Sequence, residues 1–456
     1  MTAISWNRDA LVSKAPIAPS ERMSPHADQI HNNDDWKSDM QPFYARATFM
    51  KMGPLALLYS VLFNSVLRIL SYVPFNSLLH INPSTLHPED CFMIPNSSTP
   101  PIAIITGSNT GVGFETAQGL AQRGYHVILA CRNRQKGLDA VHKINQHIIT
   151  SCREEDESKV VGKASFLQPL DLASFASIRS FCNSFSETYD SLNILVNNAG
   201  INSQGDVTED GLEMCFQSNF VGHFLLTKLL IPSLLNAENT YKNNKYKDEA
   251  GRIVNLSSVT HHFAPSNERI HPNDGSSDLS ENNGIHDKHF WLGSAMPGVS
   301  AATYRESKLA SIIFTIELNK RYGGGGEKVM GIRSVAVSPG SVSSDIWRNE
   351  SALTQKIYRM VYLTPQQGSS TSIAGSIGNL PIDAIYLQPY WHPFMRRMHS
   401  AVRSFQRSYP LSFPMFEMLG PYIGHSVSVP RLPADGCGGY KSSGQLWDAC
   451  EGLTAE

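Results

Sequence analysis

The feature that most constrains the fold of this chain is a glycine-rich turn between an apolar run and an amphipathic stretch. Residues 102–106 predict a buried strand and residues 113–123 have helical spacing. Glycines at such a turn let the backbone approach a pyrophosphate, and the helix N-terminus supplies N–H donors and a positive dipole end. The sequence therefore predicts a dinucleotide site here, formed by Gly107, Ser108, Asn109, Gly111, Val112 and Gly113.

Short apolar runs alternate with longer amphipathic stretches from Pro101 onward, as in βαβ units around a parallel sheet. We expect strands at 102–106, 126–131, 164–170, 193–197, 252–256 and 333–337. We expect helices at 113–123, 134–149, 175–189, 211–235, 303–322 and 365–377. This alternation predicts an α/β fold, a doubly wound parallel sheet of the Rossmann type with helices on both faces. Residues 439–441 are a candidate start of a final edge strand.

The pattern also divides the chain into regions. Residues 1–50 are polar and predict a disordered arm, residues 51–95 contain an apolar or amphipathic helical segment, and residues 96–456 predict a single catalytic domain. Insertions into that domain are expected near 150–163, 265–298 and 384–430. Between 384 and 416 there is no Asp or Glu, and arginines alternate with aromatic residues. Such a stretch suits a membrane interface, a cover over an apolar pocket or a packed cap helix.

The apolar run at residues 53–79 approaches the length of about 20 residues that spans a bilayer. Its polar residues Ser60, Asn64, Arg68 and Ser71 recur at helical spacing, which also suits a helix lying in the membrane interface. A helix packed on the catalytic domain is the third interpretation. We see no secretory signal in the first 40 residues. We therefore expect an intracellular protein, with the endoplasmic reticulum or another internal membrane as a candidate location.

Charge and cysteine usage exclude several classes of function. A formal net charge of −2 gives no overall attraction to nucleic acid. The seven cysteines are scattered and form no CxxC pair, so they predict neither a disulfide framework nor a zinc site. We accordingly expect no nucleic-acid partner and no metal.

Further candidate cofactor residues stand where the next strands end. An NAD site would hold an acidic residue about 20 residues after the last glycine, to bind the ribose 2′-hydroxyl. Arg132 stands there instead, 19 residues after Gly113. A guanidinium pairs with a 2′-phosphate, so NADP(H) is favoured over NAD(H), with a solvated surface arginine as the alternative. The third and fourth strands end at the remaining candidates, which are Asp171, Leu172, Asn198, Ala199 and Gly200.

Tyr304 and Lys308 begin a long helical pattern, and their spacing of four places them one turn apart on the same face. A nearby ammonium stabilises phenolate and so lowers the pKa of a tyrosine from its usual value of about 10. Tyr304 is therefore a candidate general acid/base. Taken alone, the pair is also a common coincidence on helix surfaces.

The order of these motifs carries more information than any one of them. Thr-Gly-x-x-x-Gly-x-Gly, Asn-Asn-Ala-Gly, a serine after the fifth strand and Tyr-x-x-x-Lys together resemble the short-chain dehydrogenase/reductase family. The resemblance covers roughly residues 101–380, with a weaker likeness over 438–453. The chain is most similar to retinol-dehydrogenase-like members, through the segments 219–227, 254–262, 304–321, 337–340 and 445–447. Protochlorophyllide reductases share part of the pattern.

The resemblance implies a role for each matching residue. It implies that Tyr304 exchanges a proton with the substrate, that Ser258 hydrogen-bonds the substrate oxygen and that Lys308 holds the nicotinamide ribose. It further implies that Asn219 orders a helix and a water chain, and that Pro339-Gly340 lies along the nicotinamide. Tyr304 and Lys308 would thus belong to the cofactor site as well as to the catalytic group.

The function expected from these features is that of an NADP(H)-dependent oxidoreductase that interconverts an apolar alcohol and its aldehyde or ketone. A retinoid, a steroid or a fatty aldehyde fits, because the loop at 341–364 is apolar and would cover the substrate. The 46 residues from Ser258 to Tyr304 exceed the spacing expected of retinol-dehydrogenase-like members, so substrate specificity is not inherited. One alternative is a cofactor-binding sensor or scaffold without turnover, and another is a ring double-bond reductase. A membrane surface is a candidate partner, and a homo-oligomer is left open.

Overall fold

A computed structural model gives the structure of the protein. It describes residues 100–152, 162–202, 206–237, 249–263, 300–323, 331–347, 351–378, 380, 385–390, 424–428 and 440–455. The predictions for residues 1–50, 51–95 and 265–298, and for most of 150–163 and 384–430, lie outside the described residues. Everything described belongs to one compact unit, Gln41–Glu456.

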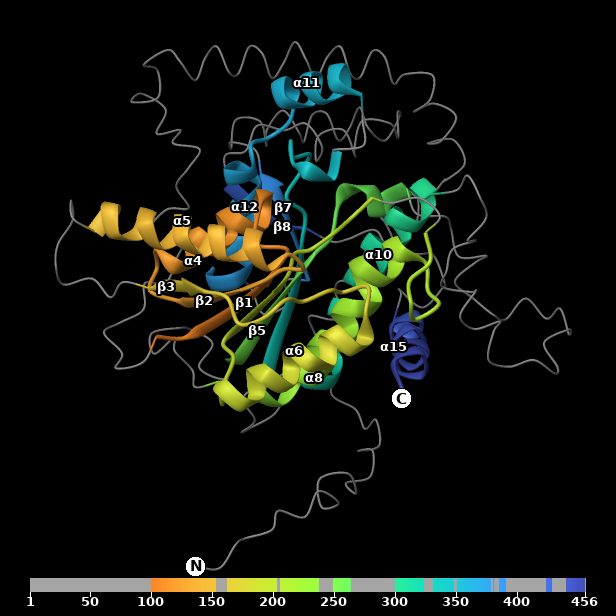
Figure 1. The fold of residues 1–456 in the computed structure, drawn as a ribbon. Coiled ribbons are helices and arrows are strands. Elements are labelled where there is room, and N and C mark those ends of the chain that lie inside the picture. The colour runs from red at the N-terminus through yellow and green to blue at the C-terminus, as the bar shows by residue number, and fades with distance from the viewer. Residues whose placement is uncertain are drawn as a thin grey trace, which may run out of the picture. The chain divides into compact units, whose positions relative to one another are not determined.

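An eight-stranded sheet forms the centre of this unit (Figure 1), with the strand order β3-β2-β1-β4-β5-β6-β7-β8. Seven strands run parallel, and only β8 is antiparallel to its neighbour. The order departs in both directions from β1 and β4, which confirms the doubly wound sheet. The strands are β1 (Ile102–Thr106), β2 (His126–Ala130), β3 (Lys163–Ser165), β4 (Ile194–Asn197), β5 (Glu249–Leu256), β6 (Gly331–Val337), β7 (Tyr386–Tyr390) and β8 (Gly424–Ser428).

Helices cover both faces of the sheet, as expected for strands that are apolar along their whole length (Figure 1). Within β1, Ile104 packs in one core cluster and Ile105 in the other, because successive side chains of a strand point to opposite faces. The Ile105 face carries α4 (Gly111–Ala121), α5 (Arg134–Cys152) and α12 (Pro365–Ile377). The Ile104 face carries α6 (Phe175–Thr188), α8 (Gly222–Leu235) and α10 (Ser300–Tyr322).

The helix expected at 211–235 is interrupted near its start. A short α7 (Met214–Phe216) leads into a π-helical segment, η4 (Gln217–Val221), which continues into α8. Such single π turns inside α-helices occur frequently at functional sites. Met214–Leu235 is also the one helix among the described residues that is long and apolar enough to cross a bilayer, but 72% of its apolar window is buried inside the protein. It is therefore a helix of the protein core, packed on one face of the sheet.

The C-terminal part of the chain differs from the sequence-based expectation. The candidate edge strand at 439–441 is wrong, because α15 (Tyr440–Thr454) begins there. Part of the insertion expected at 384–430 belongs to the sheet, since β7 extends it in parallel and β8 closes it. The short elements η5 (Val259–Phe263), η7 (Asp345–Trp347) and α11 (Ala352–Val361) lie in connecting segments.

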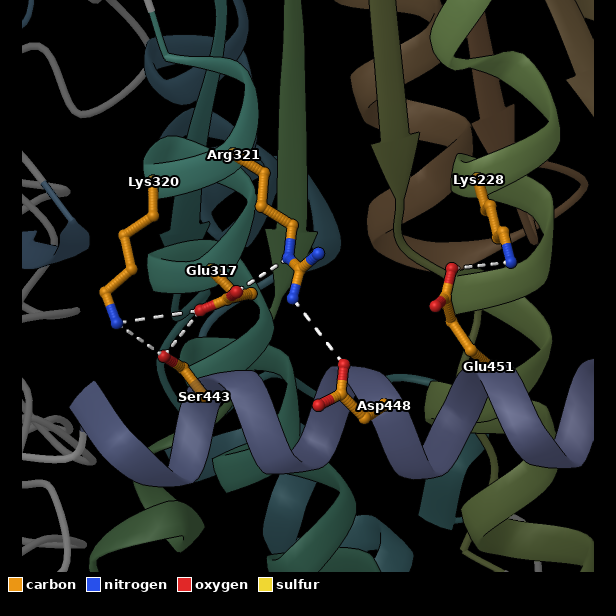
Figure 2. Close-up of polar contacts among 7 residues, drawn as sticks. All are labelled: Lys228, Glu317, Lys320, Arg321, Ser443, Asp448 and Glu451. Carbon is orange, nitrogen blue, oxygen red and sulfur yellow. Dashed lines mark hydrogen bonds and ion pairs between the residues drawn. The ribbon is translucent and has the colours of Figure 1, made fainter. Parts of the chain in front are cut away.

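The last helix, α15, packs on α8 and α10. The indole of Trp447 lies 4.9 Å from the ring of Phe224 and 5.9 Å from that of Phe314, measured between centroids. Polar contacts also join α15 to α8 and α10 (Figure 2), including a 2.7 Å ion pair between Glu451 and Lys228. The C-terminal helix thereby packs against α10, which carries Tyr304 and Lys308, and against α8, which continues from the segment of Asn219.

Candidate functional site

The glycine-rich turn leaves a bare backbone surface at the end of β1. Gly107 and Gly111 adopt φ values of 64° and 61°, a region in which side chains are strained. A Cβ on Gly113 would lie 2.4 Å from Nδ2 of Asn198 and 2.5 Å from the carbonyl oxygen of Gly107. Protein atoms fill the space that a side chain would need, so glycine lets the turn pack against the end of β4 at the N-terminus of α4, where N–H groups can bind a phosphate. These residues fit the pyrophosphate of a dinucleotide.

Thr106 joins this turn to the end of β4. Its Oγ1 accepts hydrogen bonds from the backbone N–H groups of Asn198 and Ala199, both at 2.9 Å. The side chain of Asn198 donates to the carbonyl oxygen of Thr106 at 2.7 Å. Two predicted parts of the cofactor site, the turn and the Asn-Asn-Ala-Gly motif, are therefore held against each other by buried hydrogen bonds.

The other residues of the predicted turn differ in how they are used. Ser108 is fully buried and donates to the carbonyl oxygen of Ile105 at 2.8 Å, so its hydroxyl stabilises the turn. Val112 is buried and faces α12, where a Cβ on Gly368 would lie 3.4 Å from it. Asn109 is half-buried. Val112 therefore anchors the helix, while Asn109 is the member of this set with part of its surface exposed.

The structure brings together Arg132, which follows β2, and Asp171, which lies in the segment after β3. Nη1 of Arg132 lies 3.9 Å from Oδ2 of Asp171, and the arginine side chain is 76% exposed. Such an exposed pair contributes little to stability, so the guanidinium can exchange this partner for a ligand. Leu172 is buried beside Gly222, where a Cβ would lie 2.4 Å from the Leu172 carbonyl oxygen. Leu172 thus sets how closely α8 approaches this edge of the sheet.

The candidate acid/base residue lies in the first turns of α10. The hydroxyl of Tyr304 is hydrogen-bonded to the side chain of Ser258, which stands just before η5. Nζ of Lys308 lies 5.5 Å from the centre of the Tyr304 ring and donates to the carbonyl oxygen of Leu256 at 3.0 Å. The phenol, the hydroxyl and the ammonium therefore share one location at the carboxyl end of β5.

Asn219 lies within the π-helical segment and is fixed by four hydrogen bonds. Its Oδ1 accepts from the backbone N–H of Ile201 at 2.7 Å, and its Nδ2 lies 3.0 Å from the carbonyl oxygen of the same residue. Nδ2 also lies 3.1 Å from Oγ of Ser307 and 3.3 Å from Sγ of Cys215. The amide is thus locked between the segment after β4 and the turn of α10 that carries the candidate residues Tyr304 and Lys308.

Gly200 joins Asn219 to the lysine. A Cβ on Gly200 would lie 3.3 Å from Nζ of Lys308 and 3.5 Å from Oδ1 of Asn219. A side chain at this position would therefore crowd both polar groups. The last glycine of the Asn-Asn-Ala-Gly motif therefore lets the segment after β4 approach Lys308 of α10 closely.

Burial shifts the pKa of Tyr304 in the direction opposite to our expectation. Burial raises the pKa of the phenol above its ordinary value, Cys215 raises it further, and the hydrogen bond to Ser258 lowers it. Loss of solvation outweighs the stabilisation of phenolate expected from the nearby ammonium. Burial likewise lowers the pKa of Lys308 to about 8. The site thus holds a neutral phenol beside an amine that titrates close to neutral pH.

Pro339-Gly340 follows β6 at the same edge of the sheet. The backbone N–H of Ser257 donates to the carbonyl oxygen of Val337 at 2.8 Å, so the ends of β5 and β6 are adjacent. Gly340 adopts a φ of 76°, which turns the chain sharply after the strand. The prolyl-glycyl pair is therefore placed beside the serine loop.

Three residues of the site were missed by the sequence analysis. Thr106 was counted only as the start of the turn, and Cys215 only as a scattered thiol. His223 stands four residues after Asn219, a spacing that would have placed the two on one helical face. Among the described residues, no group of three or more His, Cys, Asp and Glu side chains could hold a metal ion.

Comparisons with known proteins bear on this arrangement. The family pattern described as short chain dehydrogenase matches residues 101–268. Retinol dehydrogenase 11 of Mus musculus is 37% identical over 277 residues, which cover 60% of this chain and 72% of that protein. Polyprenol dehydrogenase of Homo sapiens is 31% identical over 281 residues, with coverages of 60% and 72%. A solved structure, salutaridine reductase from Papaver somniferum, aligns with a TM-score of 0.42 at 23% identity, covering 63% of this chain and 98% of that one.

Proposed function

This chain belongs to the short-chain dehydrogenase family, with similarity to its retinol dehydrogenases, and we propose that it interconverts an apolar alcohol and its aldehyde or ketone with NADP(H). Family membership makes it an oxidoreductase that uses a nicotinamide cofactor. The proposal concerns the finer points: the phosphorylated cofactor, the acid/base residue and the class of substrate. A sensor that binds the cofactor without turnover remains the competing function.

The observation that carries the proposal is the meeting of three groups from two segments. Tyr304 and Lys308 come from α10, and Ser258 comes from the loop after β5, yet the phenol is hydrogen-bonded to the serine and lies beside the ammonium. A non-catalytic scaffold would not need to bury this combination of polar groups, because each costs solvation free energy. The arrangement supplies a hydrogen-bond donor pair for an oxygen on which negative charge develops.

The chain's own residues then perform binding and proton transfer. The bound nicotinamide supplies the hydride. The bare backbone at Gly107 and Gly113 and the start of α4 would hold the pyrophosphate, and Lys308 would hold the adjacent ribose. In the reductive direction, Tyr304 donates its phenolic proton to the carbonyl oxygen while Ser258 hydrogen-bonds the same oxygen.

The protonation states of Tyr304 and Lys308 suit proton donation to a carbonyl oxygen. Burial raises the pKa of Tyr304, so the phenol keeps its proton at neutral pH and can donate it. Burial lowers the pKa of Lys308 to about 8, so its ammonium can release a proton near working pH and restore the phenol. These protonation states suit proton donation during reduction of an aldehyde or ketone, while the ratio of NADPH to NADP⁺ sets the net direction.

The preference for NADP(H) is proposed from Arg132. Its side chain is 76% exposed, and among the described residues its ion-pair partner is Asp171 at 3.9 Å. A 2′-phosphate would offer it a doubly charged partner with bidentate geometry. We include Asp171 in the proposed cofactor site because its carboxylate lies beside the Arg132 guanidinium.

The proposed substrate is apolar for two reasons. Two similar enzymes are a retinol dehydrogenase and a polyprenol dehydrogenase, which both act on apolar alcohols by their names. The loop after Pro339-Gly340 is closed at its base by hydrogen bonds of 2.9 Å between Ser341 or Ser343 and Leu363. Within it, the rings of Tyr358 and Tyr362 stack 4.5 Å apart. A loop of this composition is suited to cover an apolar ligand.

The test is a substrate panel on the full-length protein. Purified protein is incubated with NADPH and retinal, a long-chain fatty aldehyde, a polyprenal or a steroid ketone, with glyceraldehyde as a polar control. We expect oxidation of NADPH matched by formation of the alcohol from at least one apolar compound. Saturable NADPH binding without turnover of any compound would support the sensor, and strict dependence on light would support a ring double-bond reductase.

We also propose that the protein works at a membrane surface. The support is the apolar run at residues 53–79 together with the apolar substrate class. Cell fractionation should find the full chain with membranes and a deletion of residues 53–79 largely in the supernatant. Equal distribution of the two proteins would contradict this assignment.

A further inference from the structure

A buried imidazole lies between the cofactor turn and the catalytic asparagine. His223, in the first turn of α8, is 3% exposed. Its Nε2 lies 2.8 Å from Oγ1 of Thr106, and its Nδ1 lies 2.9 Å from the backbone carbonyl oxygen of Asn219. The single ring therefore contacts both the end of β1 and the π-helical segment. We call this pair of contacts the histidine bridge.

The partners determine which ring nitrogen carries the hydrogen. The carbonyl oxygen of Asn219 can only accept, so Nδ1 must be the donor. Oγ1 of Thr106 already accepts two backbone N–H groups, from Asn198 and Ala199, so its own hydrogen is available to be donated. It can point to Nε2 of His223 at 2.8 Å or to the carbonyl oxygen of Val196 at 3.4 Å. The shorter contact makes Nε2 the acceptor.

A neutral ring with its hydrogen on Nδ1 thus satisfies every atom of the histidine bridge. A protonated ring would direct a second N–H at a hydroxyl whose lone pairs are both occupied. Burial and the nearby positive charge of Lys308 lower the pKa of His223 to about 4, although the Asn219 carbonyl opposes them. The ring therefore stays neutral over the pH range in which the enzyme would work.

The location of the bridge gives it a consequence for the site. On one side, Thr106 holds the backbone of Asn198 and Ala199, where the cofactor strand ends. On the other side, Asn219 contacts Ser307 in α10 and lies beside Gly200, next to Lys308. Two rigid parts of the site are therefore connected through one side chain that touches neither the cofactor nor the substrate in the proposed function.

We infer that His223 is a positioning residue that fixes Asn219, and through it Lys308 and Tyr304, relative to the cofactor-binding ends of β1 and β4. This inference rests on the proposed oxidoreductase function and adds a residue to it. It also assigns a role to the π-helical segment: the segment directs the Asn219 carbonyl toward the ring while its side chain faces the catalytic helix.

Three substitutions separate the two halves of the bridge. His223→Phe keeps the ring shape and removes both hydrogen bonds. His223→Asn keeps a donor near the Nδ1 position but does not reach Thr106. His223→Gln extends an amide toward Thr106 but leaves the Asn219 carbonyl without its donor. Phe224→Leu, at the next position of the same helix, is the matched control, because Phe224 packs against Trp447 away from the bridge.

We expect His223→Phe to lower kcat about 10- to 100-fold, since small displacements of catalytic groups cost this much, while the Kd for NADPH stays within about threefold. His223→Asn should recover part of kcat, and His223→Gln should recover less, because the contact to Asn219 is the one nearer the chemistry. The pH at which kcat falls on the alkaline side should shift in His223→Phe but not in Phe224→Leu. A lower Tm with unchanged kcat and pH profile would show a purely structural residue and overturn the inference.

A measurement that does not need turnover completes the test. The ¹⁵N chemical shifts of the His223 ring in the full chain, recorded with and without NADPH, report which nitrogen carries the hydrogen. We expect hydrogen on Nδ1 alone at pH 7, and a ring protonated on Nε2 would refute the bridge. If the wild-type chain bound NADPH and turned over no substrate, the proposed function would fail, whereas the nitrogen shifts would still decide the bridge.

Discussion

The two ends of helix α10 carry polar clusters of opposite character. At its start, Tyr304 and Lys308 meet Ser258 in a site where burial shifts the pKa values of both helix residues. At its end, Glu317 receives Lys320 at 3.6 Å, Arg321 at 2.6 Å and the hydroxyl of Ser443 at 2.7 Å (Figure 2). In the first cluster the phenol, the ammonium and the serine hydroxyl are three different groups. In the second, one carboxylate contacts three polar partners.

The difference shows how burial, rather than the number of contacts, decides what a polar residue contributes. Lys320 and Arg321 are more than a third exposed, so water can replace either partner of Glu317. Lys308 is 3% exposed, and water cannot replace what it contacts. Substitutions at the start of α10 should therefore affect activity strongly, and those of the exposed charged partners at its end should affect stability weakly.

The largest effect is expected from Tyr304→Phe. Removing the phenolic hydroxyl takes away the proton donor, which should lower kcat by roughly 10²- to 10⁴-fold while the Kd for NADPH changes little. NADPH consumption and fluorescence titration measure the two quantities. Tyr322→Phe, on the same helix at the α15 contact, is the control and should retain activity. Normal turnover by Tyr304→Phe would break the comparison, because the buried end would then be no more demanding than the exposed one.

A smaller effect is expected from Arg132→Asp, an exposed residue whose contribution would come from a ligand. The carboxylate should repel a 2′-phosphate and accept a ribose hydroxyl, shifting the ratio of kcat/KM for NADPH over NADH by about 10- to 100-fold. Arg179→Asp, in which the replaced arginine caps the end of α15 through the Thr454 carbonyl, is the control. An unchanged ratio would remove Arg132 from the cofactor site.

The titration of Lys308 sharpens the comparison through pH. Its pKa is lowered to about 8, so the ammonium is present below that pH and is lost above it. For reduction, kcat/KM should be level at neutral pH and should fall by about tenfold per pH unit above 8. Lys308→Arg, whose charge persists, should lower kcat and move the fall to higher pH. Lys228→Met, at the exposed α15 contact, should leave the profile unchanged, and a shift in that variant would contradict the assignment to Lys308.

The smallest effect is expected from Asp448→Asn. Asp448 is 74% exposed and lies 3.7 Å from Nη2 of Arg321, which keeps its contact with Glu317 and with the Trp447 ring. The free energy of unfolding should change by about 0.5 kcal/mol or less, as measured by urea denaturation. Trp447→Ala should cost several times more, about 3–5 kcal/mol, because it empties a buried aromatic contact. Similar losses in the two variants would show that the ion pairs, and not the indole, hold α15.

The sequence was most informative where local pattern and tertiary context agree. Helix α12 has the predicted bounds, because Pro365 stands at its first turn and Thr364 and Gln367 form a capping box. Strand β1 also has the predicted bounds, since an apolar run ends at a glycine turn. In the site, the spacing of Tyr304 and Lys308 was sufficient to place them together. These features depend on neighbours within a few residues of one another.

The remaining features depend on partners far apart in the chain. The helix α15 begins where an edge strand was expected at 439–441, and its residue Trp447 packs against Phe224 of a distant helix. Strand β7 is paired by residues of β6 and β8, which no local pattern reveals. The sign of the Tyr304 pKa shift depends on burial, which spacing does not contain. The role proposed for His223 depends on its contact with Thr106, which lies 117 positions earlier in the chain.

Residues of the glycine-rich turn contact partners that lie far along the chain, and this separation matters during synthesis of the protein. Thr106 meets His223 across 117 positions, and Thr110 meets Asp345 across 235. At ribosomal rates of about 5–20 residues per second, the second partner emerges roughly 10–50 s after the first. During that interval the nascent chain displays its earliest strands without the segments that later enclose them. A chaperone that binds the nascent chain in that interval therefore meets the glycine-rich turn before the partners of Thr106 and Thr110 exist.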